Sequence, residues 1–421
     1  MSSTSGTAIT DTDGNSTVTL SSGAIAKGII TLGNGSDNLL INGSDLSAIT
    51  ELNGGDDVLT ADGYIDLLTL SNAGTLSFSS STLANWEKLT LDGTTLTSTD
   101  NALTVGSEAG YGLFLTNRAL LDAGTAFDLK GNLDIDSSST FQGYGAGAGT
   151  YLISGSVKNA GIITTQDGAA GDIINVQGNY TGVSGSSLLI DTQLGDDNSL
   201  TDKLVISGDA LGATAVTVTN AGGTGADTPN GIEIIKIGGL SGAVFTLTSP
   251  VQVGAYEYTL GQNDGQNWYL NSYTDPIVPV DPVDPVTPTP IYRPGTSNYV
   301  SGQTANAEQG FAALGTLHER MNEQQVVLSI DKQTWARYYG NRQSNDGATR
   351  FNYDQDINGF QIGQDLYNRT TTDGTVVHSG VMFDYSYSSV DFTDRVRENA
   401  LLESATGTMN GTSYGLGGYY T

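Results

Sequence analysis

Short apolar runs recur along residues 1–275 between clusters of Gly, Asn and Asp. Examples of four or five residues are 38–41 (NLLI), 67–70 (LLTL), 88–91 (KLTL) and 172–176 (DIINV). Runs this short, bounded by turn-forming residues, predict β-strands. They return at intervals of about 20 residues, which favours a solenoid whose turns bury their apolar faces against each other. We predict about 11–14 turns in a stack about 50–65 Å long, with a β-sandwich array as the alternative.

Proline marks the end of this region. Six of the nine prolines lie within 276–290. Because Pro fixes φ and lacks an N–H, this segment predicts an extended linker of about 3.1 Å per residue. We therefore place a β-helical region at 1–275 and a Pro-rich linker at 276–292.

The second region begins with a helical pattern. Within 300–325, spacings of three and four residues place Ala307, Phe311, Leu314, His318 and Met321 on one face. We expect a helix region at 293–325.

The segments that follow alternate with a period of two. In 376–388 one face carries Val377, Val381, Phe383, Tyr385 and Tyr387, whereas the other carries His378, Gly380, Asp384, Ser386 and Ser388. An apolar aromatic face opposite a small polar one is typical of membrane β-barrel strands, with lipid outside and water inside. Similar strands are predicted at 334–340, 358–367 and 412–421. A short turn at 369–374 and longer connections at 341–350 and 391–407 favour a first strand that runs outward.

The segments between 172 and 272 resemble a known family. In order they are GNYTG (178–182), LLIDTQLGDDNSLTDKLVISGDA (188–210), TNAGGTGADT (219–228), GIEIIKIGG (231–239), GAYEYTL (254–260) and NWYL (267–270). Together they look like the C-terminal, autochaperone part of a pertactin-like autotransporter passenger. That resemblance implies a right-handed parallel β-helix whose last turns template folding. We interpret Tyr256, Tyr258, Trp268 and Tyr269 as core or cap residues near its end.

The second region resembles the start of an autotransporter translocator. The matching features are YRPGTSNYV (292–300), a helix with TLHERM (316–321) and a strand with Trp335. The resemblance implies a twelve-stranded outer-membrane barrel around a pore helix. Four strands at 326–421 and an N-terminus without a secretion-signal pattern lead us to expect a fragment truncated at both ends.

Composition removes several classes of function. The 421 residues carry a net charge of −29 and no Cys. Disulfides, zinc fingers and thiol nucleophiles are thus excluded, and so strong an acidic balance argues against nucleic-acid partners. Region 1–275 accounts for −22 of the charge and region 293–421 for −5. An acidic surface keeps an extended chain soluble.

Candidate chemistry in 1–275 is sparse. No His occurs there, which argues against a Ser-His-Asp triad. Asp56/Asp57 and Asp196/Asp197 are formal candidates for a glycosidase pair, but we interpret them as solvated turn residues. Segments 33–39 (GNGSDNL) and 54–59 (GGDDVL) partly match a calcium-binding repeat. The sequon Asn179-Tyr180-Thr181 is uninformative.

The resemblance and the residues predict an all-β, non-enzymatic autotransporter with no catalytic residue, cofactor or metal assigned. Its barrel would export its own passenger, which we expect to be an adhesin; the alternatives are a calcium-stabilised surface rod and, less favoured, a passenger with hydrolase activity. Expected partners are outer-membrane lipid, the barrel-assembly machinery, periplasmic chaperones and a host-cell or matrix ligand. The expected location is the Gram-negative outer membrane, with the passenger at the cell surface.

Overall fold

A computed structural model describes residues 6–274 apart from Ala146, together with 289–315, 334–345, 350–374 and 376–420. The chain divides into two compact units, Met1–Tyr273 and Thr274–Thr421. Most of the predicted linker and the predicted helix positions His318 and Met321 lie outside the described residues.

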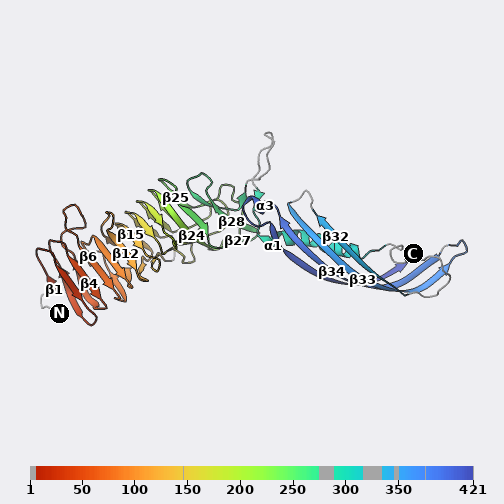
Figure 1. The fold of residues 1–421 in the computed structure, drawn as a ribbon, viewed down its shortest axis with the longest axis horizontal. Coiled ribbons are helices and arrows are strands. Elements are labelled where there is room, and N and C mark those ends of the chain that lie inside the picture. Colours follow the sequence, from red (N-terminus) through yellow and green to blue (C-terminus); the bar gives the residue numbers. More distant parts are fainter. Residues whose placement is uncertain are drawn as a thin grey trace, which may run out of the picture. The chain divides into compact units, whose positions relative to one another are not determined.

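The first unit is a parallel β-solenoid, as the strand period predicts (Figure 1). Its largest sheet contains sixteen strands, and the long strand β24 joins its two halves. One half contains β2 Thr17–Leu20, β4 Asn38–Asn42, β6 Leu67–Ser71, β9 Lys88–Asp92, β12 Gly112–Thr116, β15 Leu133–Ile135, β18 Val157–Asn159, β21 Tyr180–Gly182 and β24 Ala210–Asn220. The other half adds β7 Thr75–Phe78, β10 Thr95–Ser98, β13 Leu120–Asp122, β16 Thr140–Gln142, β19 Ile162–Thr164, β22 Ser187–Thr192 and β26 Val244–Leu247.

Two further sheets complete the walls of the solenoid. The smaller contains β1 Thr7–Thr10, β3 Ile25–Thr31, β5 Asp45–Asn53 and β8 Leu83–Ala84. The larger contains β11 Ala102–Thr104, β14 Ala126–Lys130, β17 Thr150–Ile153, β20 Ile173–Val176, β23 Lys203–Ile206, β25 Ile232–Ile237, β27 Val251–Val253, β28 Tyr256–Gly261 and β29 Trp268–Asn271. Strands β30 Tyr273–Thr274 and β31 Thr289–Pro290 flank the undescribed linker.

The core of the solenoid is a ladder of identical positions on successive turns. Leu39, Leu68, Leu89, Leu113 and Leu133 are paired in register and are fully buried. Each Leu contacts the equivalent residue above and below it, so one turn alone would leave this row exposed. Burial of each side chain contributes about 1.5–3 kcal/mol, and stacking therefore stabilises the whole array.

The solenoid has fewer turns than its sequence period predicts. Nine parallel strands from β2 to β24 stack in one wall of the described residues, which corresponds to about 40 Å at the strand spacing. The number of residues per turn varies. Ser16 and Asp37, which are hydrogen-bonded on neighbouring turns, are 21 residues apart, whereas Asp37 and Asp66 are 29 residues apart. Additional residues in the turns lengthen some of the repeats, and the apolar pattern alone does not reveal them.

The last turns of the solenoid change from parallel to antiparallel pairing. Strand β25 pairs antiparallel with β29, and β28 pairs antiparallel with β29 and β27. Tyr258 is 1% exposed, and the Trp268 ring packs edge-on against Phe245 at 5.5 Å between centroids. The interpretation as core residues is confirmed for Tyr258, which is buried, and for Tyr256 and Trp268, which pack against the core. Tyr269 is not part of this cluster, and its hydroxyl donates to Asp264 at 3.0 Å.

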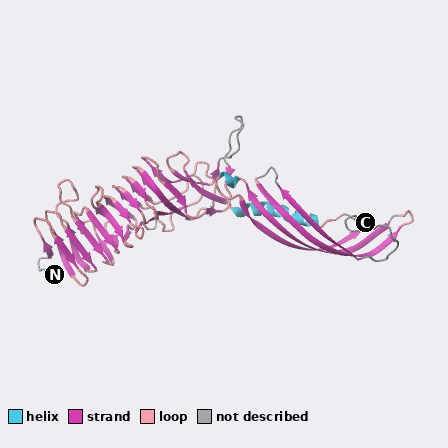
Figure 2. Ribbon diagram, in the orientation of Figure 1, coloured by secondary structure: helices cyan, strands magenta, loops and turns pink. Residues whose placement is uncertain are grey.

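The described part of the second unit contains a four-stranded antiparallel sheet, a long helix and a short one (Figure 2). Its elements are α1 Pro294–Ala312, β32 Thr334–Asn345, β33 Phe351–Thr370, β34 Val376–Asp394, α3 Val396–Asn399 and β35 Ala405–Tyr420. The strands are paired in sequence order. All four predicted strands are present, and the fold prediction is confirmed.

The strands are longer than predicted, and the connections are correspondingly shorter. The turn between β33 and β34 lies where the sequence places it. In contrast, β32 continues to Asn345 and β34 to Asp394, within the predicted loops. These extensions carry mostly polar residues, which cross-strand hydrogen bonds keep in the sheet.

Helix α1 begins at Pro294, one residue after the start of the predicted helix region at 293–325. Pro294 occupies its first turn, where a missing N–H costs nothing and the fixed φ suits a helix. The buried residues of the helix are Ser297, Ser301, Gly302, Ala305 and Gln309. The predicted apolar stripe is therefore on the other side, with Phe311 67% and Leu314 69% exposed. Apart from Gln309, the buried residues of α1 are small.

Candidate functional site: two faces of a sheet and two acidic corners

The two faces of the four-stranded sheet have opposite polarity. On β34, Asp384, Ser386 and Ser388 are buried on the side that holds α1. Phe383 and Tyr385 point the other way and are each 40% exposed. The division predicted for 376–388 is thus present, with polar residues inside and aromatic residues outside.

Cross-strand register arranges the outward side chains into rows. Tyr338, Phe360, Tyr385 and Tyr414 form one paired row, with Tyr338 72% and Tyr414 71% exposed. The next row towards the β33–β34 turn contains Ala336, Ile362, Phe383 and Leu416. We call these two rows the outer belt. In the opposite direction, the second row from the aromatic one is Arg342, Asp356, Ser389 and Asn410. The outward surface therefore changes from apolar to polar within two rows.

Where the outward surface becomes polar, the inward surface of the same strands becomes apolar. Tyr353, Val390 and Phe392 are at most 3% exposed and form an apolar cluster with Ala305 of α1. This is the ordinary arrangement of a water-soluble sheet, with its core on one side. Each strand thus has one segment with polar residues inside and apolar residues outside, and one segment with the usual apolar interior.

Hydrogen bonds hold α1 against the inner face. Gln309 Nε2 donates to Ser386 Oγ at 3.0 Å, and Gln355 Nε2 donates to the Ala305 carbonyl at 2.9 Å. The Tyr353 hydroxyl donates to Glu308 Oε2 at 2.6 Å. These bonds satisfy polar groups that burial would otherwise leave unpaired.

The end of α1 is capped from the sheet. Arg337 Nη2 and Gln361 Nε2 both donate to the Ala313 carbonyl, at 2.8 and 2.6 Å. A cation at a helix C-terminus also complements the helix dipole. The sheet therefore fixes both the face and the end of the helix.

A cation fixes the segment before α1. Arg350 Nη2 lies 2.7 Å from Asp394 Oδ2, and the guanidinium stacks on the Tyr292 ring at 4.3 Å. Arg397 Nη1 donates to the Tyr292 carbonyl at 2.7 Å. Asp394 is 1% exposed, so this pair is protected from solvent screening.

Glycines on the inner face accommodate flat aromatic side chains. A Cβ on Gly359 would lie 2.1 Å from the Tyr339 ring, and one on Gly363 would lie 2.3 Å from Trp335. The Trp335 indole also donates to the Tyr419 hydroxyl at 2.8 Å. Larger residues at these glycines would displace the rings.

A ladder of carboxylates lies in the first turns of the solenoid. In each step a backbone N–H donates to a carboxylate on the next turn. The N–H of Ser16 donates to Asp37 at 2.6 Å, that of Asp37 to Asp66 at 2.7 Å, and that of Asp66 to Glu87 at 2.6 Å. Burial raises the pKa of Asp66 and of Glu87, each to about 7. One oxygen each of Asp37 and Asp66 is buried without a hydrogen-bond partner. We call Asp37, Asp66 and Glu87 the carboxylate column.

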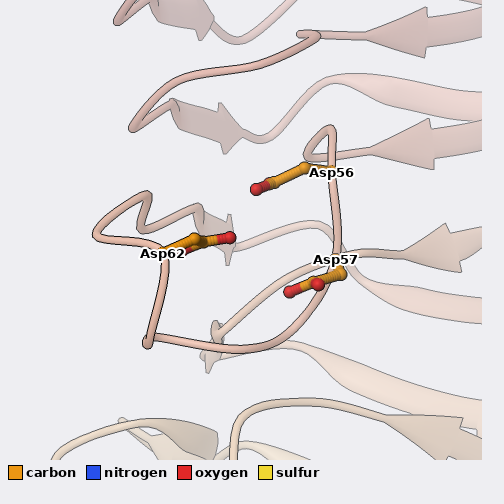
Figure 3. Close-up of side chains that lie close together, drawn as sticks. All are labelled: Asp56, Asp57 and Asp62. Carbon is orange, nitrogen blue, oxygen red and sulfur yellow. The ribbon is translucent and has the colours of Figure 1, made fainter.

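The first predicted acidic pair lies beside this column. Asp56 and Asp57 belong to the connection between β5 and β6, and Asp62 joins them from the same loop (Figure 3). One carboxylate oxygen from each of the three lies within 4.8 Å of the others. Figure 3 shows the three side chains converging on the space inside the loop.

The second predicted acidic pair braces turns. Asp197 accepts hydrogen bonds from the backbone N–H of Asn230 and of Gly231, at 3.1 and 2.9 Å. Asp196 Oδ1 accepts one from the Asn198 N–H at 2.9 Å. Asp196 therefore caps its own turn, whereas Asp197 joins its turn to the one at residues 230–231 and borders the hollow described below.

A second buried corner lies near the end of the solenoid. Asp202 accepts hydrogen bonds from the N–H groups of Asp172 and Asp191 at 3.0 and 2.8 Å, and from the Thr165 hydroxyl at 2.8 Å. Burial raises the pKa of Asp172 to about 6. These carboxylates tie three turns together and were not singled out by the sequence, since isolated Asp residues between strands read as turns.

The solenoid surface also has an open hollow of about 440 Å³. Ile173, Leu200, Lys203 and Glu233 contribute to its lining, and Lys203 Nζ lies 3.5 Å from Glu233 Oε1. Across the described ranges, no helix is both long enough and apolar enough to cross a membrane.

In comparisons with known proteins, each of two family models matches a segment within one of the two units. Residues 154–260 match the family model described as Autochaperone Domain Type 1, and residues 334–421 match the Autotransporter beta-domain. The chain is 35% identical over 272 residues to protein YdeU of Escherichia coli K12, covering 60% of this chain and 57% of that protein.

Two relatives are named as adhesins. Identity is 34% over 295 residues to "Adhesin BmaC autotransporter" of Brucella suis, covering 62% of this chain and 8% of that protein. It is 31% over 264 residues to "Autotransporter adhesin AIDA-I" of Escherichia coli, covering 59% and 19%. The chain thus spans little more than half of YdeU and a much smaller part of the two adhesins.

Proposed function

The chain is an autotransporter protein, and we propose from this that its β-solenoid is a surface-displayed passenger that acts as an adhesin. The observation that carries the proposal is a long solenoid joined in one chain to an autotransporter β-domain. The names of the BmaC and AIDA-I relatives support it. A stack of repeated turns offers an extended surface, which suits binding to large partners such as host-cell or matrix molecules.

The second unit would serve export and anchoring at the outer membrane. Its outer belt has the composition that lipid requires, and its inner face carries the polar groups that would line a pore around α1. The barrel-assembly machinery and periplasmic chaperones are the partners expected for its insertion. The passenger would cross the membrane unfolded and fold outside from its last turns, where the autochaperone match lies.

An enzymatic passenger is disfavoured. Residues 1–275 contain neither His nor Cys, and the acidic pairs occupy turns. The proposal is therefore a binding role without catalysis.

Adhesion is tested on intact Gram-negative cells that express the chain in its full-length protein. We expect saturable attachment to at least one component of a glycan and matrix-protein panel. The matched control expresses the Leu89→Asp variant, which disrupts the core of the solenoid but leaves the four-stranded sheet of the second unit unchanged. Equal attachment by both strains, or attachment by neither, contradicts the adhesin role.

Export is tested separately by adding protease to the same intact cells. The solenoid should be accessible from outside, whereas cells with a disrupted outer belt should display less of it. Passenger that stays protected in intact cells contradicts the export proposal and leaves the adhesion assay to be done on purified protein.

A further inference from the structure

The loop between β5 and β6 is an insertion beside the carboxylate column. Successive partners along this ladder are 21 residues apart from Ser16 to Asp37 and again from Asp66 to Glu87, but 29 apart from Asp37 to Asp66. The additional residues bring in Asp56, Asp57 and Asp62. Between Lys27 and Lys88 the chain contains no Lys or Arg, so no protein cation from this stretch offsets their charge.

The three loop carboxylates are arranged for a shared ligand. Their oxygens approach within 4.8 Å of one another and converge inside the loop (Figure 3). The loop backbone uses only part of this capacity: Asp57 Oδ1 accepts the Leu59 N–H at 2.6 Å, and Asp62 Oδ1 accepts the Tyr64 N–H at 3.0 Å. Asp56 and Asp62 also share a side-chain hydrogen bond, which a bound cation would replace.

A second and independent feature is the buried oxygen of Asp66. This residue is fully buried, and its Oδ1 accepts the Asp37 N–H, but its Oδ2 has no partner. The unpartnered oxygen lies against the base of the loop, since a Cβ added to Gly54 or Gly55 would be 2.8 or 3.5 Å from it. Gly54 and Gly55 directly precede Asp56. Burying a carboxylate oxygen without a partner is unfavourable, and nearby positive charge would offset that cost.

We propose that this loop binds one divalent cation of the calcium type through Asp56, Asp57 and Asp62, next to the unpartnered oxygen of Asp66. Calcium takes six to eight oxygen ligands at about 2.3–2.6 Å, so two ligand oxygens on one ion are at most about 5 Å apart. The observed spacing fits this limit. Water completes the coordination, because Asp57 and Asp62 are exposed.

Calcium fits this loop better than magnesium. Magnesium requires near-ideal octahedral geometry at about 2.0–2.1 Å, whereas calcium accepts irregular arrangements of carboxylates. An open loop with three carboxylates and water corresponds to the weaker class of calcium sites, with Kd on the order of 10⁻⁴–10⁻³ M.

The consequence is a brace on the first turns of the solenoid. Burial is the main cause of the raised pKa of Asp37, Asp66 and Glu87, and the nearby charge of Asp56 adds to it. An ion on the loop would cancel this repulsion and tie the insertion to the wall beneath it. This site does not depend on the adhesin role.

The test uses the full chain in detergent micelles, freed of metal with a chelator and titrated with CaCl₂ in a calorimeter. Asp57→Asn together with Asp62→Asn removes two exposed ligands without touching the column. Asp196→Asn together with Asp197→Asn is the matched control in another acidic turn. Circular dichroism confirms that each variant is folded.

We expect one calcium site in the parent and in the control, and at least a tenfold weaker Kd in the Asp57/Asp62 variant. The thermal midpoint of the parent should rise with calcium, and that of the folded Asp57/Asp62 variant should not. No calcium heat in the parent at millimolar concentration overturns the proposal, as does an unchanged site in the Asp57/Asp62 variant. An equal response to MgCl₂ overturns the assignment to calcium.

Discussion

The two units are built from β-strands with the same alternation but bury opposite kinds of side chain. In the solenoid, Leu68 and Leu89 point inward and are fully buried. In the four-stranded sheet, Phe383 and Tyr385 point outward, while Ser386 and Ser388 are enclosed with α1. Alternation alone therefore specifies a strand and its two faces. Which face is interior depends on what surrounds the sheet.

The comparison also holds within a single strand. Along β34, the outward residues change from Phe383 and Tyr385 to Ser389 and Asp391, while the inward residues change from Ser386 to Val390 and Phe392. Both faces change polarity over a few residues. A strand that passes from an apolar into an aqueous medium would show this change, as the proposed role requires.

The largest expected effect is a charge in the solenoid core. Leu89→Asp would place a carboxylate between Leu68 and Leu113 with no partner, so we expect a loss of at least about 4 kcal/mol in the free energy of unfolding. Urea unfolding of the chain measures it. Thr90→Asp, on the neighbouring outward position, is the control and should cost less than about 1 kcal/mol. Equal losses would show that the two faces do not differ as described.

The next largest effect is expected from a charge on the outward face of the four-stranded sheet, in the outer belt. Phe383→Lys should destabilise insertion into lipid by about 2–4 kcal/mol, because an ammonium group would face hydrocarbon. Folding into phospholipid vesicles, followed by heat-dependent gel mobility, measures the effect. Ser389→Lys, beyond the belt on the same strand, should cost about 0–1 kcal/mol. If the two variants insert equally well, the belt does not end where the register places it.

A smaller effect is expected at the contact between α1 and the sheet. Ala305→Leu would overfill the cluster of Tyr353, Val390 and Phe392, at a cost of about 1–3 kcal/mol. Ala307→Leu, on the exposed side of the same helix, is the matched control and should be nearly neutral. Protease cleavage of α1 in folded protein compares the two variants. Faster cleavage of the Ala307 variant would reverse our assignment of the buried face.

The smallest effect concerns pH. The pKa of Asp172 is raised to about 6 in the folded chain, above its ordinary value, so its neutral form is favoured by folding. The resulting stabilisation is complete below the ordinary pKa and is lost as pH rises through about 6. Between about pH 5 and pH 8 this amounts to about 1.4 kcal/mol.

Thermal melts of the parent and of Asp172→Asn across this range provide the measurement. The variant keeps an oxygen that can accept the Gly149 N–H but cannot ionise, and its melting temperature should depend less on pH. A parent that becomes more stable on going from pH 5 to pH 8, by an amount the variant does not share, would contradict the raised pKa.

Several features of the fold were predictable because they depend on local patterns. The strand around Phe383 and the short turn after Thr370 follow from alternation and from the residues TTDG, and the solenoid follows from repeated apolar runs. The face of α1 was not predictable in the same way. The apolar spacing of the helix predicts that Phe311 and Leu314 are buried. The structure instead buries Ser301, Ala305 and Gln309, because close approach and hydrogen bonding determine which face is enclosed.

The candidate sites show the same limit. The sequence indicated Asp56 and Asp57 as acidic turn residues and as part of an imperfect calcium-like segment. It did not indicate Asp62 as their neighbour or the unpartnered oxygen of Asp66, since both depend on how a loop folds over a stacked wall. Asp172 and Asp202 are separated by 30 residues and interact only because one turn lies on the next.

The sequence by itself determined that this protein is made of short stacked strands followed by longer alternating ones, since side-chain alternation and turn residues act over a few neighbouring positions. The tertiary structure alone decided how many turns stack, which face of α1 meets the sheet, and which carboxylates share a corner. These depend on register between distant residues, and only the folded chain brings such residues together.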